Sequence, residues 1–237
     1  MKALVVNDDG VRAEGIKILV QKLLPYAESI VVVAPSTEKS AASQSLTIRK
    51  PITLEILPDI IPGIKTYAID ANPADCVIFA SRALKIDFDT VFSGINRGYN
   101  VGNDIMYSGT VAAATEAVMH GYRGIAVSCK YDSFEGSQYF DEVMQYLLNS
   151  ELWNTKTVIN VNMPKTSMGI KITHQAVSTY ESYYVKNSDG TYGMACDTDI
   201  PLDDEINGDI QTIKAGYISI TPLTINRTDL KLYNKYH

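Results

Sequence analysis

Hydrophobic and polar positions at the start of the chain follow the patterns of a buried strand, an amphipathic helix and a second buried strand. Residues 3–6 form a short, continuous apolar run, typical of a strand covered on both faces. Residues 14–24 carry apolar residues at every third or fourth position, and Pro25 follows where that helix is expected to end. Residues 30–34 are another apolar run. This order of strand, helix and strand predicts an α/β fold with a parallel sheet.

Elements of both kinds continue to residue 162. The expected strands cover residues 46–57, 64–69, 89–93, 124–129 and 157–162. The expected helices cover residues 73–85, 109–120 and 137–149, the first with Asn72 as its cap and Pro73 at its first position. Two polar segments, 35–45 and 94–107, are predicted to be loops.

After Pro164 the pattern changes to alternating segments rich in Tyr and Thr. Strands are expected at 170–177, 180–187, 191–196 and 216–223, and a short helix at 208–213. We therefore divide the chain into an α/β core, residues 1–164, and a β-rich extension, residues 165–237. Because such hairpins are marginally stable alone, the extension is predicted to form an oligomer contact.

Composition narrows the class of protein. The 237 residues are 46% hydrophobic and 20% charged with a net charge of −6, which suits one large domain and argues against a non-specific nucleic-acid binder. Cys76, Cys129 and Cys196 show no C-x-x-C spacing, so reduced and mostly buried thiols are expected. The apolar start is too short for a signal peptide and no apolar run has the length of a membrane span, so the expected location is the cytoplasm.

The first predicted strand is followed by Asn7-Asp8-Asp9-Gly10, a turn with two adjacent carboxylates. Their mutual repulsion favours a cation beside them, and hard oxygen ligands favour Mg²⁺, Mn²⁺ or Ca²⁺ over zinc. The three histidines, at positions 120, 174 and 237, show no zinc-ligand spacing. A helix cap is the simpler alternative, but it explains one aspartate better than a pair.

Polar loops leave the carboxyl ends of the expected strands, where open α/β sheets bind their ligands. One of them, 35–45, contains Ser40, Ser43 and Ser45, whose hydroxyls suit a metal or a phosphate. From composition alone, an ordinary solvated loop is the simpler interpretation of this segment.

The segment from Ser93 to Asp104 is dense in Gly and Asn and leads to a helix for which Ser108 is a good N-cap. The N–H groups of Gly109 and Thr110 at that helix start would form a phosphate seat, although a flexible loop and an ordinary cap are an equal alternative. The sequence contains no G-K-[ST] Walker loop, and no G-x-G-x-x-G follows the first strand, which disfavours a dinucleotide-binding dehydrogenase.

Together these segments resemble the survival protein SurE family of nucleotidases. The matching stretches are VVNDDGVRAEGI, VVVAPSTEKSAASQSLTI, NPADCV, FSGINRGYNVGNDIMYSGTVAAATEA, VNMP and GYISITPLT, in the family's order over nearly the whole chain. GIN-x-G-x-N-x-G followed by YSGTVAAA is the most specific of them. Two departures stand out, because Ala41 and Ala71-Asn72-Pro73 occupy positions where the family usually has Gly and Gly-Thr-Pro.

The resemblance implies a metal-dependent phosphomonoesterase that acts on nucleoside 5'-monophosphates, with nucleoside 3'-monophosphates and short polyphosphate as candidate further substrates. It implies one divalent cation per subunit, Mn²⁺ or Mg²⁺, with ligands that match Asp8, Asp9, Ser40 and Asn96. The residues that match its phosphate-contacting segment are Asn96, Ser108, Gly109 and Thr110. The implied fold is a Rossmann-like three-layer domain with a mostly parallel sheet, whose C-terminal β extension is exchanged within a homodimer or homotetramer.

In the expected mechanism the cation neutralises and orients the phosphate and lowers the pKa of a bound water, with Asp9 or Asn7 positioning that water. Attack by an aspartate through a phosphoenzyme is the alternative. Tyr99 and Tyr107 are candidates for stacking on the base, and buried packing is as good an explanation for either. Two rival classes are a nucleotide-binding module without hydrolysis and a structural α/β protein whose tail builds oligomers.

Overall fold

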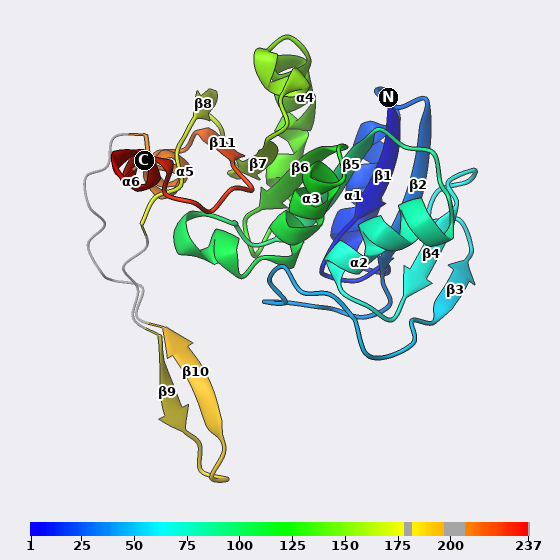
Figure 1. Ribbon diagram of the computed structural model, residues 1–237, viewed down its shortest axis with the longest axis horizontal. Helices are drawn as coiled ribbons and strands as arrows, with labels where there is room; N and C mark the ends of the chain where they lie inside the picture. Colours follow the sequence, from blue (N-terminus) through cyan, green and yellow to red (C-terminus); the bar gives the residue numbers. More distant parts are fainter. Residues whose placement is uncertain (178–181, 197–206, 237) are drawn as a thin grey trace.

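The computed structural model describes residues 1–177, 182–196 and 207–236, and its centre is a nine-stranded sheet (Figure 1). The strands lie in the order β3-β4-β2-β1-β5-β6-β7-β11-β8. Their bounds are Lys2–Val6 (β1), Ser29–Pro35 (β2), Leu54–Leu57 (β3), Thr66–Ile69 (β4), Thr90–Arg97 (β5), Arg123–Cys129 (β6), Val158–Met163 (β7), Ile170–Ile172 (β8) and Ile218–Leu223 (β11).

Most neighbouring strands of this sheet run parallel. The antiparallel pairs are β3 with β4 near one edge and β11 with β7 near the other. The central strands β1, β2, β5 and β6 are buried almost throughout, which explains their continuous apolar runs. The predicted α/β fold with a mostly parallel sheet is confirmed.

Helices cover both faces of the sheet, which gives three layers. The helices α1 (Glu14–Leu23) and α4 (Phe140–Leu148) pack in one apolar core, and α2 (Pro73–Ile78) and α3 (Gly109–Met119) pack in the other. The alanine-rich α3 lies very close to the sheet, since a Cβ on Gly124 of β6 would be 2.0 Å from the carbonyl oxygen of Ala114. Small residues on both elements therefore set the position of α3.

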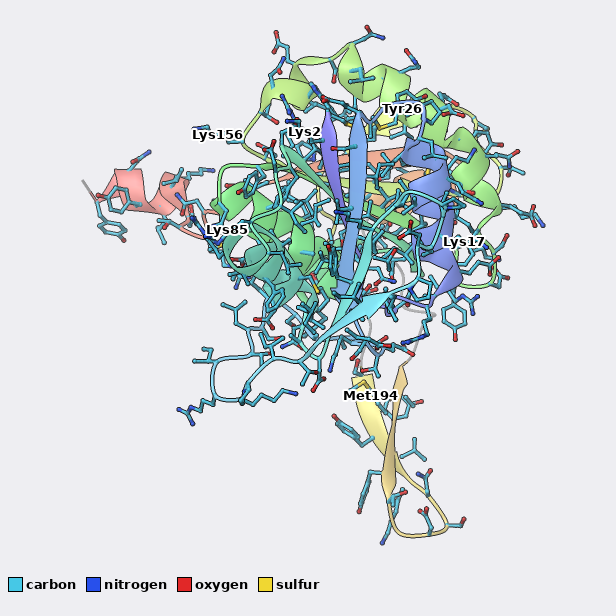
Figure 2. All side chains as sticks on the ribbon, turned by 90° about the vertical axis from the view of Figure 1, so that its right-hand side faces the viewer. Lys2, Lys17, Tyr26, Lys85, Lys156 and Met194 are labelled. Atoms are coloured by element: carbon cyan, nitrogen blue, oxygen red, sulfur yellow. The ribbon has the colours of Figure 1, made fainter. Side chains whose placement is uncertain are left out.

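The C-terminal part is divided between the main sheet and a separate hairpin. Strands β8 and β11 extend the main sheet, whereas β9 (Ser182–Lys186) and β10 (Tyr192–Cys196) pair only with each other. Figure 2 shows this hairpin, on which Met194 is labelled, standing clear of the α/β body. Two short helices, α5 (Asp209–Lys214) and α6 (Leu230–Lys235), complete the extension. The oligomer contact stays a prediction.

Several predicted boundaries are wrong, and α6 was not predicted. The expected strand 46–57 is limited to Leu54–Leu57, and the strand expected at 170–177 ends at Ile172. Residues 94–97 are strand rather than loop, because Asn96 and Arg97 pair with β6 beyond an irregularity. The helix expected at 73–85 changes at Phe79 to a wider π-type turn that ends at Ala83.

Two of the three cysteines are buried thiols, as expected. Cys76 and Cys129 are free and buried, and burial raises the pKa of both thiols, that of Cys129 to about 12. The side chain of Cys196 and residues 180–181 of an expected strand lie outside the described part. None of the helices described is both long and apolar enough to cross a membrane.

Candidate active site

The candidate site lies where the chain reverses its direction of winding across the sheet. From β1 the chain continues through α1 to β2 on one side, whereas β5 pairs with β1 on the other side. The loops after β1 and β5 therefore diverge, the first towards α1 on one face of the sheet and the second towards α3 on the other face. Such a switch point at the carboxyl edge is where open α/β sheets bind ligands.

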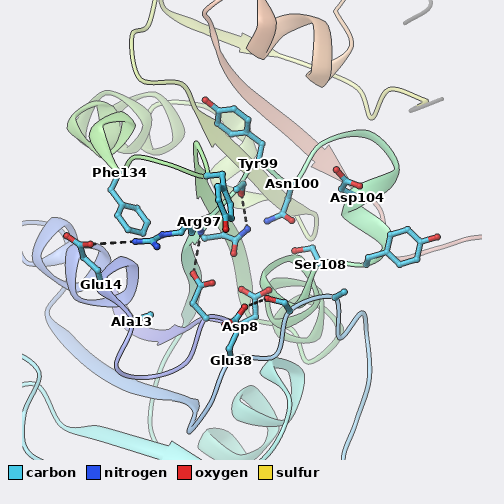
Figure 3. A pocket seen from close by; sticks show the side chains of 17 residues that line it. Asp8, Ala13, Glu14, Glu38, Arg97, Tyr99, Asn100, Asp104, Ser108 and Phe134 are labelled. Atoms are coloured by element: carbon cyan, nitrogen blue, oxygen red, sulfur yellow. Dashed lines mark hydrogen bonds and ion pairs between the residues drawn. The ribbon is translucent and has the colours of Figure 1, made fainter. Parts of the chain in front are cut away.

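A cavity of about 550 Å³ opens at this edge (Figure 3). It brings together five of the predicted residues from four separate segments: Asp8, Asp9, Ser40, Asn96 and Ser108. Asn7, Gly109 and Thr110 are not among the residues that line it. They lie behind the lining, where they hold the turn and the helix start.

Asp8 is almost completely buried, and it joins the end of β1 to the start of α3. The hydroxyl of Thr110 donates a 2.5 Å hydrogen bond to its Oδ1 atom. Burial raises the pKa of Asp8 to about 6, the charge of Asp9 adds to the effect, and the Thr110 hydrogen bond opposes it. A carboxylate in such a place is costly to ionise, and a cation bound beside it would remove that cost.

Asp9 is partly exposed to the cavity and experiences a similar electrostatic environment. Burial raises its pKa, and the negative charge of Glu38 acts in the same direction. The backbone N–H of Arg97 donates to its Oδ2 atom at 3.3 Å and opposes the shift. The turn thus holds two carboxylates with raised pKa values, because too little positive charge lies beside them.

Ser40 and Asn96 add neutral oxygen atoms to the two carboxylates. The hydroxyl of Ser40 donates to Glu38 Oε1 at 2.6 Å, and the amide nitrogen of Asn96 donates to the Gly98 carbonyl at 2.8 Å. The second bond leaves Oδ1 as the atom of Asn96 that a cation could use. This donor set of oxygens suits a hard divalent cation such as Mg²⁺ or Mn²⁺.

Among the residues the structure describes, no group of three or more His, Cys, Asp or Glu side chains could hold a metal ion. A cation at this edge would therefore depend on the neutral oxygens of Ser40 and Asn96 as well as on the two aspartates. That mixture is unlike the His and Cys sets that bind zinc.

The phosphate seat stays a prediction, whereas the N-cap predicted for the same helix start is confirmed. Ser108 is the N-cap of α3, and its Oγ accepts a hydrogen bond from the Val111 N–H at 3.1 Å. Gly109 follows in direct contact with the turn after β1, since a Cβ there would lie 2.8 Å from the Cβ of Asp8. Only glycine fits at this point without a shift, so the helix start and the acidic turn share one wall.

Asn7 occupies a different position from the one its predicted role requires. It is fully buried, and its amide nitrogen donates to the Gly10 carbonyl at 2.8 Å, which closes the turn. Its side-chain oxygen is buried without a hydrogen-bond partner. The structure thus places Asn7 under the turn, whereas Asp9 faces the cavity.

Sequence reasoning missed several residues that line the cavity. Arg97 is the most informative, because its guanidinium lies 5.5 Å from the centre of the Phe134 ring and 3.9 Å from a Glu14 carboxylate oxygen. The other unpredicted acidic side chains of the lining are Glu38 and Asp104, and an unpredicted aromatic one is Tyr131. Tyr99 and Tyr107, the two predicted base-stacking candidates, both line the cavity.

Three features define the class of this protein: an α/β sheet with its switch point at an open cavity, paired aspartates, and a capped helix start beside them. This is an α/β protein with a candidate cation and phosphate site at the carboxyl edge of its sheet. Comparisons with known proteins agree with this class and specify the family.

The model of the family described as Survival protein SurE matches residues 3–182. A protein named 5'-nucleotidase SurE from Petrotoga mobilis is 37% identical over 244 residues, covering 96% of this chain and 94% of the relative. Another with that name, from Thermosynechococcus vestitus, is 37% identical, with 96% and 92% covered. A crystal structure of the SurE protein from Aquifex aeolicus superposes with a TM-score of 0.83 at 31% identity, covering 99% of this chain and 98% of that one. The chain belongs to the survival protein SurE family.

Proposed function

We propose that this protein is a 5'-nucleotidase, which splits nucleoside 5'-monophosphates into nucleoside and phosphate with one bound divalent cation per subunit, Mn²⁺ or Mg²⁺. Its family membership supports the reaction class, because the relatives at 37% identity carry the name 5'-nucleotidase SurE. In the structure, the main support for this function is one cavity lined by Asp8, Asp9, Ser40, Asn96 and the helix N-cap Ser108.

The charges of the cavity support the dependence on a cation. Its acidic lining consists of Asp8, Asp9, Glu14, Glu38 and Asp104, and its basic residue is Arg97. Because most of these charges are negative, the surface would repel a phosphate dianion. A divalent cation between the aspartates would reverse the local field.

Each group of the chain then has a defined task. A divalent cation, when bound, supplies charge that neutralises the phosphate and lowers the pKa of a water molecule. The four oxygen-bearing side chains named above would hold it. The Ser108 hydroxyl and the N–H groups at the start of α3 would bind the equatorial phosphate oxygens, because the positive end of the helix dipole lies there.

Asp9 is the residue best placed to orient the attacking water, because it faces the cavity and Asn7 does not. Attack by the water oxygen forms a new bond to phosphorus as the bond to the nucleoside 5' oxygen breaks. One water proton goes to the departing 5' oxygen, so that the products are a nucleoside and inorganic phosphate. Trapping of an aspartyl-phosphate by rapid quench would overturn this version in favour of attack by an aspartate.

The test is phosphate release from the four common nucleoside 5'-monophosphates, with Mn²⁺, with Mg²⁺ and with EDTA. Asp9→Asn removes one proposed ligand, and Asp87→Asn, outside the cavity, serves as the matched control. We expect activity with a divalent ion that disappears with EDTA and with Asp9→Asn. Activity that survives both treatments equally would refute the proposal, and nucleotide binding without phosphate release would identify a binding module instead.

Two finer features of the proposal have separate readouts. Nucleoside 3'-monophosphates and short polyphosphate, tested in the same assay, decide whether the cavity accepts phosphates in other positions. We also propose a homodimer or homotetramer formed through the C-terminal extension, which light scattering coupled to size exclusion measures directly. The exposed aromatic side chains of the β9–β10 hairpin support that assembly.

A further inference from the structure

A buried carboxylate outside the cavity lies on the same helix as the phosphate seat. Glu116 of α3 is 4% exposed, and it does not line the cavity. Its Oε2 atom accepts a 2.7 Å hydrogen bond from the side-chain amide of Gln44, and its Oε1 atom lies 3.0 Å from the Nε2 atom of His120. Charged side chains are rarely buried without a purpose in packing or function, and nothing in the proposed chemistry uses this one directly.

Gln44 belongs to the loop that carries Ser40, and this loop is folded as a compact unit. The Ala42 N–H donates to the Lys39 carbonyl at 3.2 Å, and the Ser45 hydroxyl donates to the Ala42 carbonyl at 2.7 Å. Ala41 and Ser43 have left-handed backbones with φ of 55° and 53°. L-residues adopt this conformation only when their surroundings hold them there.

The unit is attached to the site at both ends. At its start, the Lys39 N–H donates to the Asp8 carbonyl at 2.7 Å. At its far end, the Ser43 N–H donates to the Tyr107 carbonyl at 2.9 Å, and the Gln44 side chain reaches Glu116. Of these attachments, the bond to Glu116 is the one made between two side chains and to a charged group, which is the stronger kind of hydrogen bond.

We propose that Glu116 is a positioning residue of the cation site, which acts through Gln44 to hold the 39–45 loop and thereby keeps Ser40 at the cavity that Asp8 and Asp9 line. This inference rests on the proposed cation site. Since Glu116 and Ser108 are on one rigid helix, the contact also sets the Ser40 loop at a fixed distance from the phosphate seat. His120 fixes the orientation of the carboxylate from its other oxygen.

The test compares Glu116→Ala with Glu116→Gln, using Mn²⁺ titration followed by electron paramagnetic resonance and hydrogen exchange of residues 39–47. We expect Glu116→Ala to weaken Mn²⁺ binding about tenfold and to speed exchange in the loop, because a charge-assisted bond is lost. Glu116→Gln should stay within about threefold of wild type, since its amide oxygen still accepts from Gln44. Val118→Ala, a core truncation on the same helix, should reduce thermal stability but leave both readouts unchanged.

Gln44→Ala removes the same contact from the loop side and serves if Glu116→Ala does not fold. The double variant Gln44→Ala/Glu116→Ala should bind Mn²⁺ as the single variants do, because each substitution removes the same hydrogen bond. Wild-type Mn²⁺ affinity and loop exchange in Glu116→Ala or Gln44→Ala would overturn the inference. Both readouts are independent of hydrolysis, so a protein that binds Mn²⁺ without releasing phosphate would contradict the proposed function and leave this inference to be decided separately.

Discussion

The hydroxyl of Thr110 donates to the Asp8 carboxylate, so that the start of α3 and the turn after β1 meet through a direct side-chain hydrogen bond. Gly109 packs against the same aspartate, with no room for a Cβ between them. Any movement of Asp8 is therefore transmitted to the N-terminus of α3. The proposed cation site and the proposed phosphate seat form one rigid unit.

Asp8→Asn should change how stability depends on pH in EDTA. Burial raises the pKa of Asp8 from 3.8 to about 6, so the folded protein binds this proton more tightly than the unfolded chain between these values. The free energy of unfolding therefore falls as pH rises through that window, by at most about 3 kcal/mol from this group. Asp8→Asn lacks this component, which urea unfolding at several pH values measures. Equal slopes for wild type and variant would contradict the expectation.

Adding Mn²⁺ should offset the loss of stability that the ionised Asp8 carboxylate causes in the wild-type protein. A ligand that binds only the folded state at 100 times its Kd adds about 2.7 kcal/mol to the free energy of unfolding. Thermal unfolding with Mn²⁺ and with EDTA should therefore differ strongly for wild type and little for Asp8→Asn. The control is Asp87→Asn, an exposed aspartate paired with Lys2, which should respond to Mn²⁺ as wild type does. A full response in Asp8→Asn would exclude Asp8 as a ligand.

Ser108 is expected to have two separable roles, as helix cap and as phosphate contact. Ser108→Ala removes the acceptor of the Val111 N–H bond and should cost about 1 kcal/mol of stability as well as activity. Ser108→Asp keeps a capping oxygen but puts a negative charge in the phosphate seat. It should retain near-normal stability and raise KM sharply. If Ser108→Asp restores both stability and KM, the side chain acts only as a cap.

Five of the residues predicted for the site line one cavity, because they lie next to strands or a helix whose patterns are evident in the sequence. Asp8, Asp9 and Ser108 each come directly after or before a regular element, so their placement at one edge followed from the parallel sheet. Asn7 could not be placed in this way, because only the fold shows that its side chain turns inward to Gly10. The strand character of Asn96 was hidden by the glycines around it, since its pairing with β6 is a tertiary contact.

Local sequence patterns could not predict the side-chain contacts between residues far apart in the chain. Glu116 and Gln44 are 72 positions apart, and neither lies in a pattern that indicates a partner. Glu38 is in a loop predicted to be solvated, yet it approaches both Ser40 and Asp9. In contrast, residues 46–53 alternate as a strand would, but Ile48 is 84% exposed and pairs with no neighbouring strand.

Ala41→Gly is expected to stabilise the loop that carries Ser40. Ala41 has a φ of 55°, and an alanine in the left-handed region costs about 1–2 kcal/mol, part of which the greater chain entropy of glycine offsets. The net gain should be about 0.5–1 kcal/mol in the free energy of unfolding. Ala42→Gly is the matched control in the same loop, and because Ala42 is not left-handed it should lose stability. Equal effects of the two substitutions would exclude relief of strain at Ala41.

The β9–β10 hairpin is expected to hold subunits together through its apolar side chains. Tyr184 and Met194 are directly opposite each other in the hairpin, and each is 66% exposed. A two-stranded hairpin with such a surface gains stability by packing against another molecule. The double variant Tyr184→Lys/Met194→Glu replaces the apolar pair by opposite charges that remain compatible with strand pairing. It should lower the mass measured by light scattering and leave the melting temperature of the α/β core nearly unchanged. Met119→Lys, an exposed apolar position of α3 outside the extension, should keep the wild-type mass. An unchanged mass in the double variant would show that these two side chains do not contribute to assembly.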